Sequence, residues 1–346
     1  MPLHNLSNIK QIVAVAAGKG GVGKSTLAVN LALYFQSKGY RVGLMDADLY
    51  GPSLKKMVPE ESGPSQESER VVPAQSRGMK LMSMAYFLSD KRPTSVRAPI
   101  ANEIIKQFIH LVDWGELDFL FIDFPPGTGD IQLTLVQEGM LSGAVLITTP
   151  QQVALLDVSK TAEMFLHTQI PIIGIVENMS FFTMGNEVVF PFGQEGGERF
   201  AQERGLFFLG KIPIEPQISY CADMGKSLFE EGAGTPAAAA IAGIGEKIKE
   251  QLDAFAKLGG RLFIREVHQK DDHGFTIEWS DGKISAYHLG EVQSQCPCVR
   301  CRDERPQIDR SVKASRILNL GSYALQIFFT TGCSKGIYPL WLLRQI

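Results

Sequence analysis

A glycine-rich stretch near the N-terminus has the residue types and the spacing to hold the phosphate groups of a nucleotide. Residues 18–25 read Gly-Lys-Gly-Gly-Val-Gly-Lys-Ser, which matches the pattern G-x-x-x-x-G-K-[ST]. Glycines let successive backbone N–H groups curl around an anion, and a helix beginning at Lys24 adds its positive N-terminal end. We expect Lys24 to reach the β- and γ-phosphates and the Ser25 hydroxyl to ligate Mg²⁺. The residues expected to line the nucleotide are Gly18, Lys19, Gly20, Gly21, Val22, Gly23, Lys24, Ser25 and Thr26.

Acidic residues follow two of the apolar runs. Residues 119–122 are Phe-Leu-Phe-Ile and precede Asp123. This is a Walker B pattern, and we expect Asp123 to serve Mg²⁺ through a water molecule. Asp46 and Asp48 end another run, and Asp48 is a candidate to orient the attacking water or to contact Mg²⁺. Helix capping or turn formation is the alternative for either acid. Residues 125–130 are expected to form a loop that moves with the γ-phosphate.

The cysteines are clustered. The chain has five, and four lie in its last 51 residues: Cys296, Cys298, Cys301 and Cys333. Three thiols within six residues can point at one ion, and four sulfurs in tetrahedral array suit Zn²⁺ or iron. Unmetallated surface thiols are the alternative, and His268, His273 or His288 are candidates to replace one ligand. A clustered, odd number of cysteines favours metal-binding thiols in a reducing compartment over disulfides.

These residues need elements to position them. Apolar runs at residues 11–17, 42–46, 119–124, 144–149 and 172–176 predict buried strands, and residues 24–37, 102–112, 131–139 and 153–167 predict helices between them. Strand–helix alternation with near-continuous apolar strands predicts an α/β fold, in which a mostly parallel sheet has helices on both faces. Residues 60–75, rich in Ser, Glu and Pro, are expected to be a disordered surface loop.

A second, smaller domain is expected at the C-terminus. A helix starting near Pro236 is followed by a boundary at residues 257–260. Beyond it, alternating apolar residues (Phe275, Ile277, Trp279), a turn at residues 281–282 and an apolar run at 323–329 predict a β-rich domain. The chain is therefore divided into an ATPase domain at residues 1–257 and a metal-binding domain at residues 261–346.

Composition excludes several classes of protein. The net charge of −3 gives no signal for nucleic acid. The longest uncharged apolar runs are strand-sized, far below the roughly 18 residues of a membrane helix. No apolar signal region precedes Lys10. We therefore expect a cytoplasmic protein that binds neither membrane nor nucleic acid.

Lys19, a second lysine inside the phosphate loop, marks the deviant Walker A subclass. Together with residues 46–53, 123–130, 149–151 and 177–180, it makes residues 10–255 resemble the Mrp/ApbC family of MinD-like ATPases, which are implicated as iron–sulfur cluster carriers. The resemblance implies a homodimer with ATP near the subunit interface, in which Lys19 reaches the partner's nucleotide. It also implies that Asn178 contacts the adenine base; a strand-end cap is the alternative.

One segment departs from that family. Its cluster-carrying members have a C-x-x-C pair shortly after the segment that corresponds to Asn178–Ser180, whereas residues 181–193 contain no cysteine. Because thiolates are the usual ligands of such clusters, the family's interfacial cluster site is not expected here. Arg97-Ala98-Pro99 also departs mildly from the family's Arg-Gly-Pro.

The C-terminal region shows its own resemblance. Residues 277–282, 296–301, 321–325 and 336–338 are similar to the small zinc-binding domain at the N-terminus of γ-butyrobetaine hydroxylases, which is also found fused to Mrp-type proteins. The usual fourth ligand there is a histidine, and Cys333 occupies its position. The resemblance implies Zn²⁺ at the four cysteines, and the all-sulfur set keeps an iron–sulfur cluster as the alternative.

Together these patterns predict a function. Lys19, Lys24, Asp48 and Asp123 would carry Mg²⁺-dependent ATP hydrolysis in a homodimeric iron–sulfur cluster carrier with apoprotein clients. A MinD/ParA-like positioning ATPase and a nucleotide-gated adaptor without cluster transfer are the alternatives.

Overall fold

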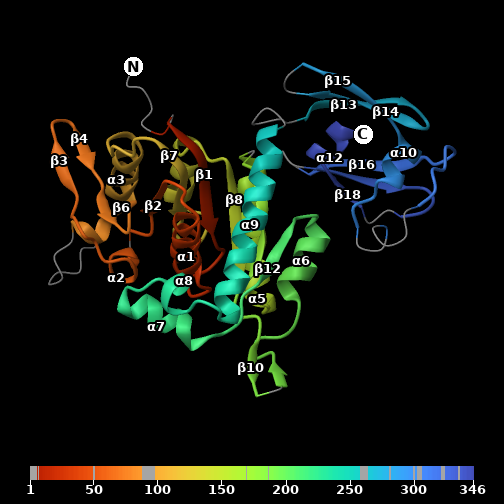
Figure 1. Cartoon of the computed structure of the whole chain (residues 1–346). Coiled ribbons are helices and arrows are strands. Elements are labelled where there is room, and N and C mark those ends of the chain that lie inside the picture. Colours follow the sequence, from red (N-terminus) through yellow and green to blue (C-terminus); the bar gives the residue numbers. More distant parts are fainter. Residues whose placement is uncertain are drawn as a thin grey trace. The chain divides into compact units, whose positions relative to one another are not determined.

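The computed structural model describes residues 6, 8–49, 51–87, 98–168, 170–185, 187–257, 264–279, 282–298, 301, 306–320, 324–333 and 336–346. Several sequence expectations fall outside these ranges: those on Tyr50, Arg97, residues 258–260, Asp281 and residues 321–323. The chain forms two compact units, Met1–Lys249 and Glu250–Ile346. Each is described separately below (Figure 1).

The first unit is built on an eight-stranded sheet in the order β12-β9-β8-β1-β7-β2-β6-β5. Neighbouring strands are parallel except for β5 and β6. The strands are β1 (Ile9–Ala16), β2 (Val42–Asp46), β5 (Ala74–Ser76), β6 (Met79–Ser83), β7 (Leu117–Asp123), β8 (Gly143–Thr148), β9 (Ile172–Glu177) and β12 (Phe208–Lys211). The five predicted strands are β1, β2, β7, β8 and β9, which are buried along nearly their whole length, as expected of strands covered on both faces.

Helices connect these strands. They are α1 (Lys24–Ser37), α2 (Leu54–Met57), α3 (Ala98–His110), α4 (Asp130–Glu138), α5 (Gln152–His167), α6 (Gly196–Arg204), α7 (Pro216–Met224), α8 (Leu228–Glu231) and α9 (Pro236–Lys257), with a 3₁₀ turn η1 (Met84–Tyr86). Helix α1 packs on β1, β2 and β7, whereas α5 packs on β8 and β9, and α3 pairs with α4. The four predicted helices are α1, α3, α4 and α5, and the mostly parallel α/β fold predicted from the sequence is confirmed.

The disordered loop predicted for residues 60–75 is wrong. Strands β3 (Ser65–Glu67) and β4 (Arg70–Val72) form an antiparallel hairpin, and β5 pairs with β6 at the sheet edge. The backbone of Val71 exchanges hydrogen bonds with Leu111 and Asp113 at the end of α3, with lengths of 2.9 Å. These partners are distant in sequence, so a polar composition read locally could not indicate them.

A second small hairpin follows β9. Strands β10 (Phe182–Met184) and β11 (Glu187–Val189) pair antiparallel, separately from the main sheet. They lie in residues 181–193, the segment in which cluster-carrying members of the Mrp/ApbC family would have a C-x-x-C pair.

The second unit contains two three-stranded antiparallel sheets. One has the order β13 (Ile264–Asp271), β14 (Gly274–Trp279), β15 (Ile284–His288), and the other β16 (Ala314–Leu320), β17 (Ala324–Phe329), β18 (Ile337–Pro339). Among the described residues, the short helices α10 (Leu289–Ser294) and α12 (Leu340–Gln345) accompany them. Trp279, Ile277 and Ile327 from both sheets share one core with Cys296 and Cys301. The C-terminal region is therefore β-rich, as predicted.

Among the described residues, none of the helices combines the length and the apolar character needed to cross a bilayer.

Candidate nucleotide site and metal centre

The glycine-rich loop joins β1 to α1 at the carboxyl edge of the sheet. Gly23 lies immediately before the helix with φ of 92°, a left-handed conformation that favours glycine. A Cβ atom there would also lie 2.2 Å from Nδ2 of Asn178. Glycine is thus required twice over at this position, by backbone conformation and by the close approach of a side chain.

Two strands bring acids to the edge of the sheet where the loop lies. Asp123 is the last residue of β7 and is paired in register with Val15 of β1 and Asp46 of β2. Parallel neighbours end at one edge of a sheet, so the loop after β1 and the two acids meet there. The sequence predicted this convergence for Asp123 and the loop; the structure adds that Asp46 is its direct neighbour.

Lys24 lies among these acids. Its Nζ atom is 2.5 Å from Oδ1 of Asp123, 3.8 Å from Oδ2 of Asp48 and 3.4 Å from the Ser25 hydroxyl. Lys24 and Asp123 are both buried. Burial raises the pKa of Asp123 above its ordinary value, and the positive charge of Lys24 opposes that rise. Lys24 therefore compensates buried carboxylates at the place where a phosphate group would compete for it.

Asp46 is held by three hydrogen bonds. Its carboxylate accepts from the backbone N–H of Asp48 at 3.0 Å, from the hydroxyl of Ser83 at 3.0 Å and from the backbone N–H of Leu54 at 3.4 Å. Burial, and then the charge of Asp123, raise the pKa of Asp46 to about 7. The site thus places two buried carboxylates beside a single lysine, an excess of negative charge that a divalent cation would neutralise.

Asn178 reaches the phosphate loop from the end of β9. Its Nδ2 donates to the carbonyl of Val22 at 2.8 Å, and its backbone N–H donates to Thr148 at 2.8 Å. The side chain is buried. It therefore bonds to the loop itself in this structure, and contact with an adenine base stays a prediction.

Lys19 differs from Lys24 in its surroundings. It is half-buried, and within the described part of the chain its side chain makes no hydrogen bond or ion pair. Among the described residues, its ammonium group therefore has no partner on the same chain.

Two buried polar residues that sequence reasoning missed hold the loops around the site. Gln132 of α4 donates from Nε2 to the carbonyls of Pro125 at 3.2 Å and Pro126 at 2.7 Å, which fixes the loop after Asp123. Glu177 accepts from the Ser180 hydroxyl at 2.5 Å and from the backbone N–H of Gly197 at 2.6 Å. Gln132 belongs to no recognised motif. Glu177 lies in residues 177–180, which carried the family resemblance, but no role was predicted for it.

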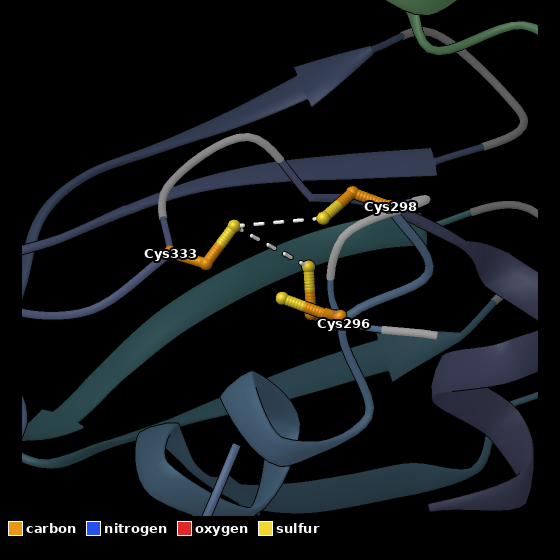
Figure 2. Close-up of side chains that lie close together, drawn as sticks. Cys296, Cys298 and Cys333 are labelled. Carbon is orange, nitrogen blue, oxygen red and sulfur yellow. Dashed lines mark hydrogen bonds between the residues drawn. The ribbon is translucent and has the colours of Figure 1, made fainter. Parts of the chain in front are cut away.

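The four clustered cysteines meet in the second unit. Cys296 and Cys301 are buried, Cys298 and Cys333 are half-buried, and their four sulfurs all lie within 4.8 Å of one another. Figure 2 shows the sulfur of Cys333 facing those of Cys298, at 3.6 Å, and Cys296, at 3.8 Å. The sequence prediction that these thiols come together therefore agrees with their placement.

This geometry fits one tetrahedral ion. Zinc–sulfur bonds of about 2.3 Å place neighbouring sulfurs of a tetrahedron about 3.8 Å apart. A cluster of several irons would hold the thiolates on different metals and spread them further. Burial raises the pKa of Cys296 well above its usual value and that of Cys301 to about 11. Ion binding would have to displace those protons.

The four cysteines follow elements that belong to two different sheets. Cys296, Cys298 and Cys301 follow α10, which continues from β15, whereas Cys333 follows β17. Gln293 of α10 donates from Nε2 to the carbonyl of Thr331 at 2.6 Å, which ties the two cysteine-bearing segments together. A metal ion at this centre would join the two sheets of the unit.

Comparison with known proteins identifies both regions. The profile of a family described as "NUBPL iron-transfer P-loop NTPase" matches residues 8–249. The chain belongs to this family. A second profile, "Gamma-butyrobetaine hydroxylase-like, N-terminal", matches residues 266–344. Both resemblances drawn from the motifs are thereby confirmed.

Relatives of the NUBPL-type NTPase region carry consistent names. An "Iron-sulfur cluster carrier protein" of Aquifex aeolicus is 39% identical over 251 residues, which cover 71% of this chain and 69% of the relative. A protein of the same name from Pseudomonas fragi is 44% identical over 229 residues, covering 65% of this chain and 80% of the relative.

Solved structures agree with this fold. A nucleotide-binding protein from Archaeoglobus fulgidus in complex with ADP has a TM-score of 0.58 and 34% identity, covering 68% of this chain and 93% of its own. The cell division ATPase MinD of Pyrococcus furiosus, with a TM-score of 0.52 and 20% identity, covers 70% of this chain and 99% of its own and shows the fold alone. This NUBPL-type protein is thus a nucleotide-binding P-loop NTPase.

Proposed function

We propose that this protein is an ATP-hydrolysing iron–sulfur cluster carrier or assembly factor that works as a nucleotide-dependent homodimer. The observation that carries the proposal is the position of Lys24, whose ammonium group lies between Asp123 and Asp48 at the end of the phosphate loop. Family membership and the names of the relatives supply the cluster-carrier part.

The chemistry at the loop follows from charge. Lys24 would exchange its carboxylate partners for the β- and γ-phosphates of ATP. This would free Asp123 to hold Mg²⁺ through water, and the Ser25 hydroxyl would be a direct ligand of the ion. When bound, Mg²⁺ supplies neutralising charge to the phosphate oxygens. Asp48 is left to orient the attacking water. Asp46 fixes the backbone of Asp48 through its hydrogen bond to the Asp48 N–H.

The homodimer proposal depends on Lys19. Its side chain has no partner in the described part of its own chain, so it is available to a phosphate bound by a second copy. An ammonium group supplied in trans would stabilise the charge that develops on the transferred phosphoryl group.

The cysteine centre is proposed to hold Zn²⁺ in a structural role. Four thiolates leave no open coordination position for water, and the sulfur spacing fits one ion. We accordingly propose that residues 1–257 are the ATPase domain and residues 261–346 the metal-binding domain. Apoproteins of iron–sulfur assembly in the cytoplasm are the proposed clients.

One observation favours a second candidate, a nucleotide-gated adaptor without cluster transfer. The β10–β11 hairpin occupies the segment in which related carriers hold cysteines, and residues 181–193 contain none. In that case ATP would control partner binding alone.

Two measurements separate these functions. Mg²⁺-dependent phosphate release from ATP should be present and should be lost in Lys24→Ala; absence of turnover in the wild type would favour the adaptor. Zinc, iron and sulfide per chain should be determined after anaerobic purification, and transfer of a reconstituted cluster to an apo-ferredoxin should be followed. Failure of transfer despite turnover would refute the carrier function.

A further inference from the structure

Among the described residues, the hydroxyl of Tyr338 in β18 is buried without a well-formed hydrogen bond. The residue is 0% exposed, and its Oη atom lies near the sulfur of Cys296 but does not reach full hydrogen-bond geometry with it or with another described residue. An unsatisfied hydroxyl in a protein core is costly, and native structures rarely keep one without a reason. The Tyr338 hydroxyl therefore needs a hydrogen-bond acceptor.

Such an acceptor lies beside it. Gly336 packs against both groups: a Cβ atom on this residue would lie 2.6 Å from the sulfur of Cys296 and 3.2 Å from Cζ of Tyr338, the ring carbon that bears the hydroxyl. The absence of a side chain at Gly336 leaves room for both the ring and the sulfur to pack against this residue. The electrostatic surroundings of the phenol are dominated by burial and by Cys296, with Cys333 and Cys301 next.

A bound ion would turn Cys296 into the missing acceptor. Four thiolates around one divalent cation leave a net charge of about −2 in a largely buried site, and hydrogen bonds to the sulfurs are a principal means of stabilising such a charge. A neutral thiol is a weak acceptor, whereas a metal-bound thiolate is a strong one. The Tyr338 hydroxyl would then have an acceptor, and its hydrogen bond would offset part of the negative charge on the four thiolates.

We propose that the Tyr338 hydroxyl donates a hydrogen bond to the Cys296 thiolate when the four cysteines hold a metal ion, and that this bond slows loss of the ion. The inference rests on the proposed metal centre. Tyr338 is a positioning residue in this scheme: it binds no metal itself and acts through the sulfur of Cys296.

Tyr287 offers a matched control in the same core. Its hydroxyl is likewise buried without a well-formed hydrogen bond within the described residues, and its ring stacks on Phe275 with centroids 5.1 Å apart. The groups that act on its phenol are Ser285, Arg344 and Trp279, with no cysteine among them. Tyr287→Phe therefore removes a comparable hydroxyl from the same core without touching the thiolates.

The test compares Tyr338→Phe and Tyr287→Phe with the wild-type chain, each loaded with Zn²⁺ and then with Co²⁺. Zinc transfer to a chromogenic chelator should be about 10–100-fold more favourable for Tyr338→Phe, the usual effect of losing such an outer hydrogen bond, and unchanged for Tyr287→Phe. The thiolate-to-cobalt charge-transfer band should move to lower energy in Tyr338→Phe alone, because a thiolate without its donor is the better electron donor.

The possible outcomes are distinct. Equal zinc retention and equal cobalt spectra in all three proteins, each with one ion per chain, would overturn the role of Tyr338 and leave the metal centre standing. No metal uptake by the wild type would overturn both. Should Tyr338→Phe fail to fold, fluorotyrosine incorporated in place of tyrosine serves instead. Its more acidic phenol should slow zinc release equally in the wild type and in Tyr287→Phe, and unchanged release would refute the proposal.

Discussion

Lys24 is the residue on which nucleotide binding depends most directly. It is buried, and its Nζ atom lies 2.5 Å from Oδ1 of Asp123. Among the described ion pairs of the site, Lys24 supplies the positive charge. Lys24→Ala removes a charge-assisted contact to the phosphates, a loss of roughly 1.5–3 kcal/mol. ATP affinity or turnover should therefore fall at least tenfold, as measured by calorimetry and phosphate release.

A control on the same helix sharpens this prediction. Lys38, exposed at the opposite end of α1, contributes a similar charge far from the loop, and Lys38→Ala should bind ATP as the wild type does. Unchanged hydrolysis in a folded Lys24→Ala protein would contradict the assignment of the phosphate loop.

Lys19 should behave differently. Because its side chain has no partner among the described residues of its own chain, Lys19→Ala should leave ATP affinity within a few-fold of the wild type, while hydrolysis and ATP-dependent dimerisation should drop sharply. Sedimentation with and without ATP, alongside turnover, checks this. A wild-type protein that stays monomeric with ATP at micromolar concentration would argue against action in trans.

The sequence predicted the residues that belong to motifs and missed those that support them. Lys24 and Asp123 belong to motifs with diagnostic spacing, so their meeting at the phosphate loop could be anticipated. The same is true of the four cysteines, which could be expected to meet one another. Gln132 and Ser83 could not, because a glutamine on a helix or a serine at a strand end is commonplace. Only the folded chain shows that Gln132 bonds the Pro125 and Pro126 carbonyls and that Ser83 bonds Asp46.

At the level of elements, predictability followed burial. Strands β1, β2, β7, β8 and β9 are apolar throughout because they are covered on both faces, and that signal is local in the sequence. Strands β3, β4 and β5 are short and largely polar. They pair with strands next to them in the chain, β3 with β4 and β5 with β6, but Val71 of β4 also bonds to Leu111 and Asp113 far along the sequence. Non-local hydrogen bonds of that kind leave no periodicity to recognise.

The edge of the sheet opposite the site is held by an acid between three strands. Asp118 of β7 accepts from the backbone N–H of Arg41 at 2.9 Å and pairs with Lys10 at 2.9 Å and with the Arg41 guanidinium at 3.3 Å. Hydrogen bonds from Lys10 and then Arg41 hold the pKa of Asp118 well below its ordinary value of 3.8.

This depressed pKa sets a pH dependence for Asp118→Asn. A carboxyl whose pKa is lower in the folded state stabilises the fold above its unfolded pKa, and this stabilisation is lost as pH falls through the folded value. The variant should lose about 1 kcal/mol at pH 7, since the basic partners are largely exposed. The difference from the wild type should shrink steadily below pH 3.8.

Urea unfolding over this pH range measures the effect. Asp223→Asn is the control, because its pair with Lys56 is exposed on both sides and should contribute almost nothing at any pH. A stability difference for Asp118→Asn that persisted unchanged into strong acid would show that the charge of Asp118 is not its cause.

The two units of the chain differ in what stabilises their folds. The first has a large buried sheet, whereas the second is small and has two three-stranded sheets sharing a limited core. Small domains often need a metal ion to supplement such a core. Cysteine spacing predicted which thiols come together. It could not predict that Cys333 follows a strand of the other sheet, so it did not show that a metal ion held by these thiols would connect the two sheets.

Cys333→Ser tests that division of labour. It removes the ligand contributed from the β17 side, so zinc should be released and the β13–β18 region should lose protection from hydrogen exchange, since the ion no longer joins the two sheets. ATP affinity at the phosphate loop, which lies in the other unit, should stay as in the wild type. Cys221→Ser, at a buried cysteine with no part in the cluster, should retain zinc and exchange protection. Loss of ATP binding together with zinc would show that the units fold as one.

The identity of the metal is tested separately. Iron and sulfide in anaerobic preparations, with a visible sulfur-to-iron band that vanishes in Cys298→Ser, would show that these four thiols hold an iron–sulfur cluster and not zinc.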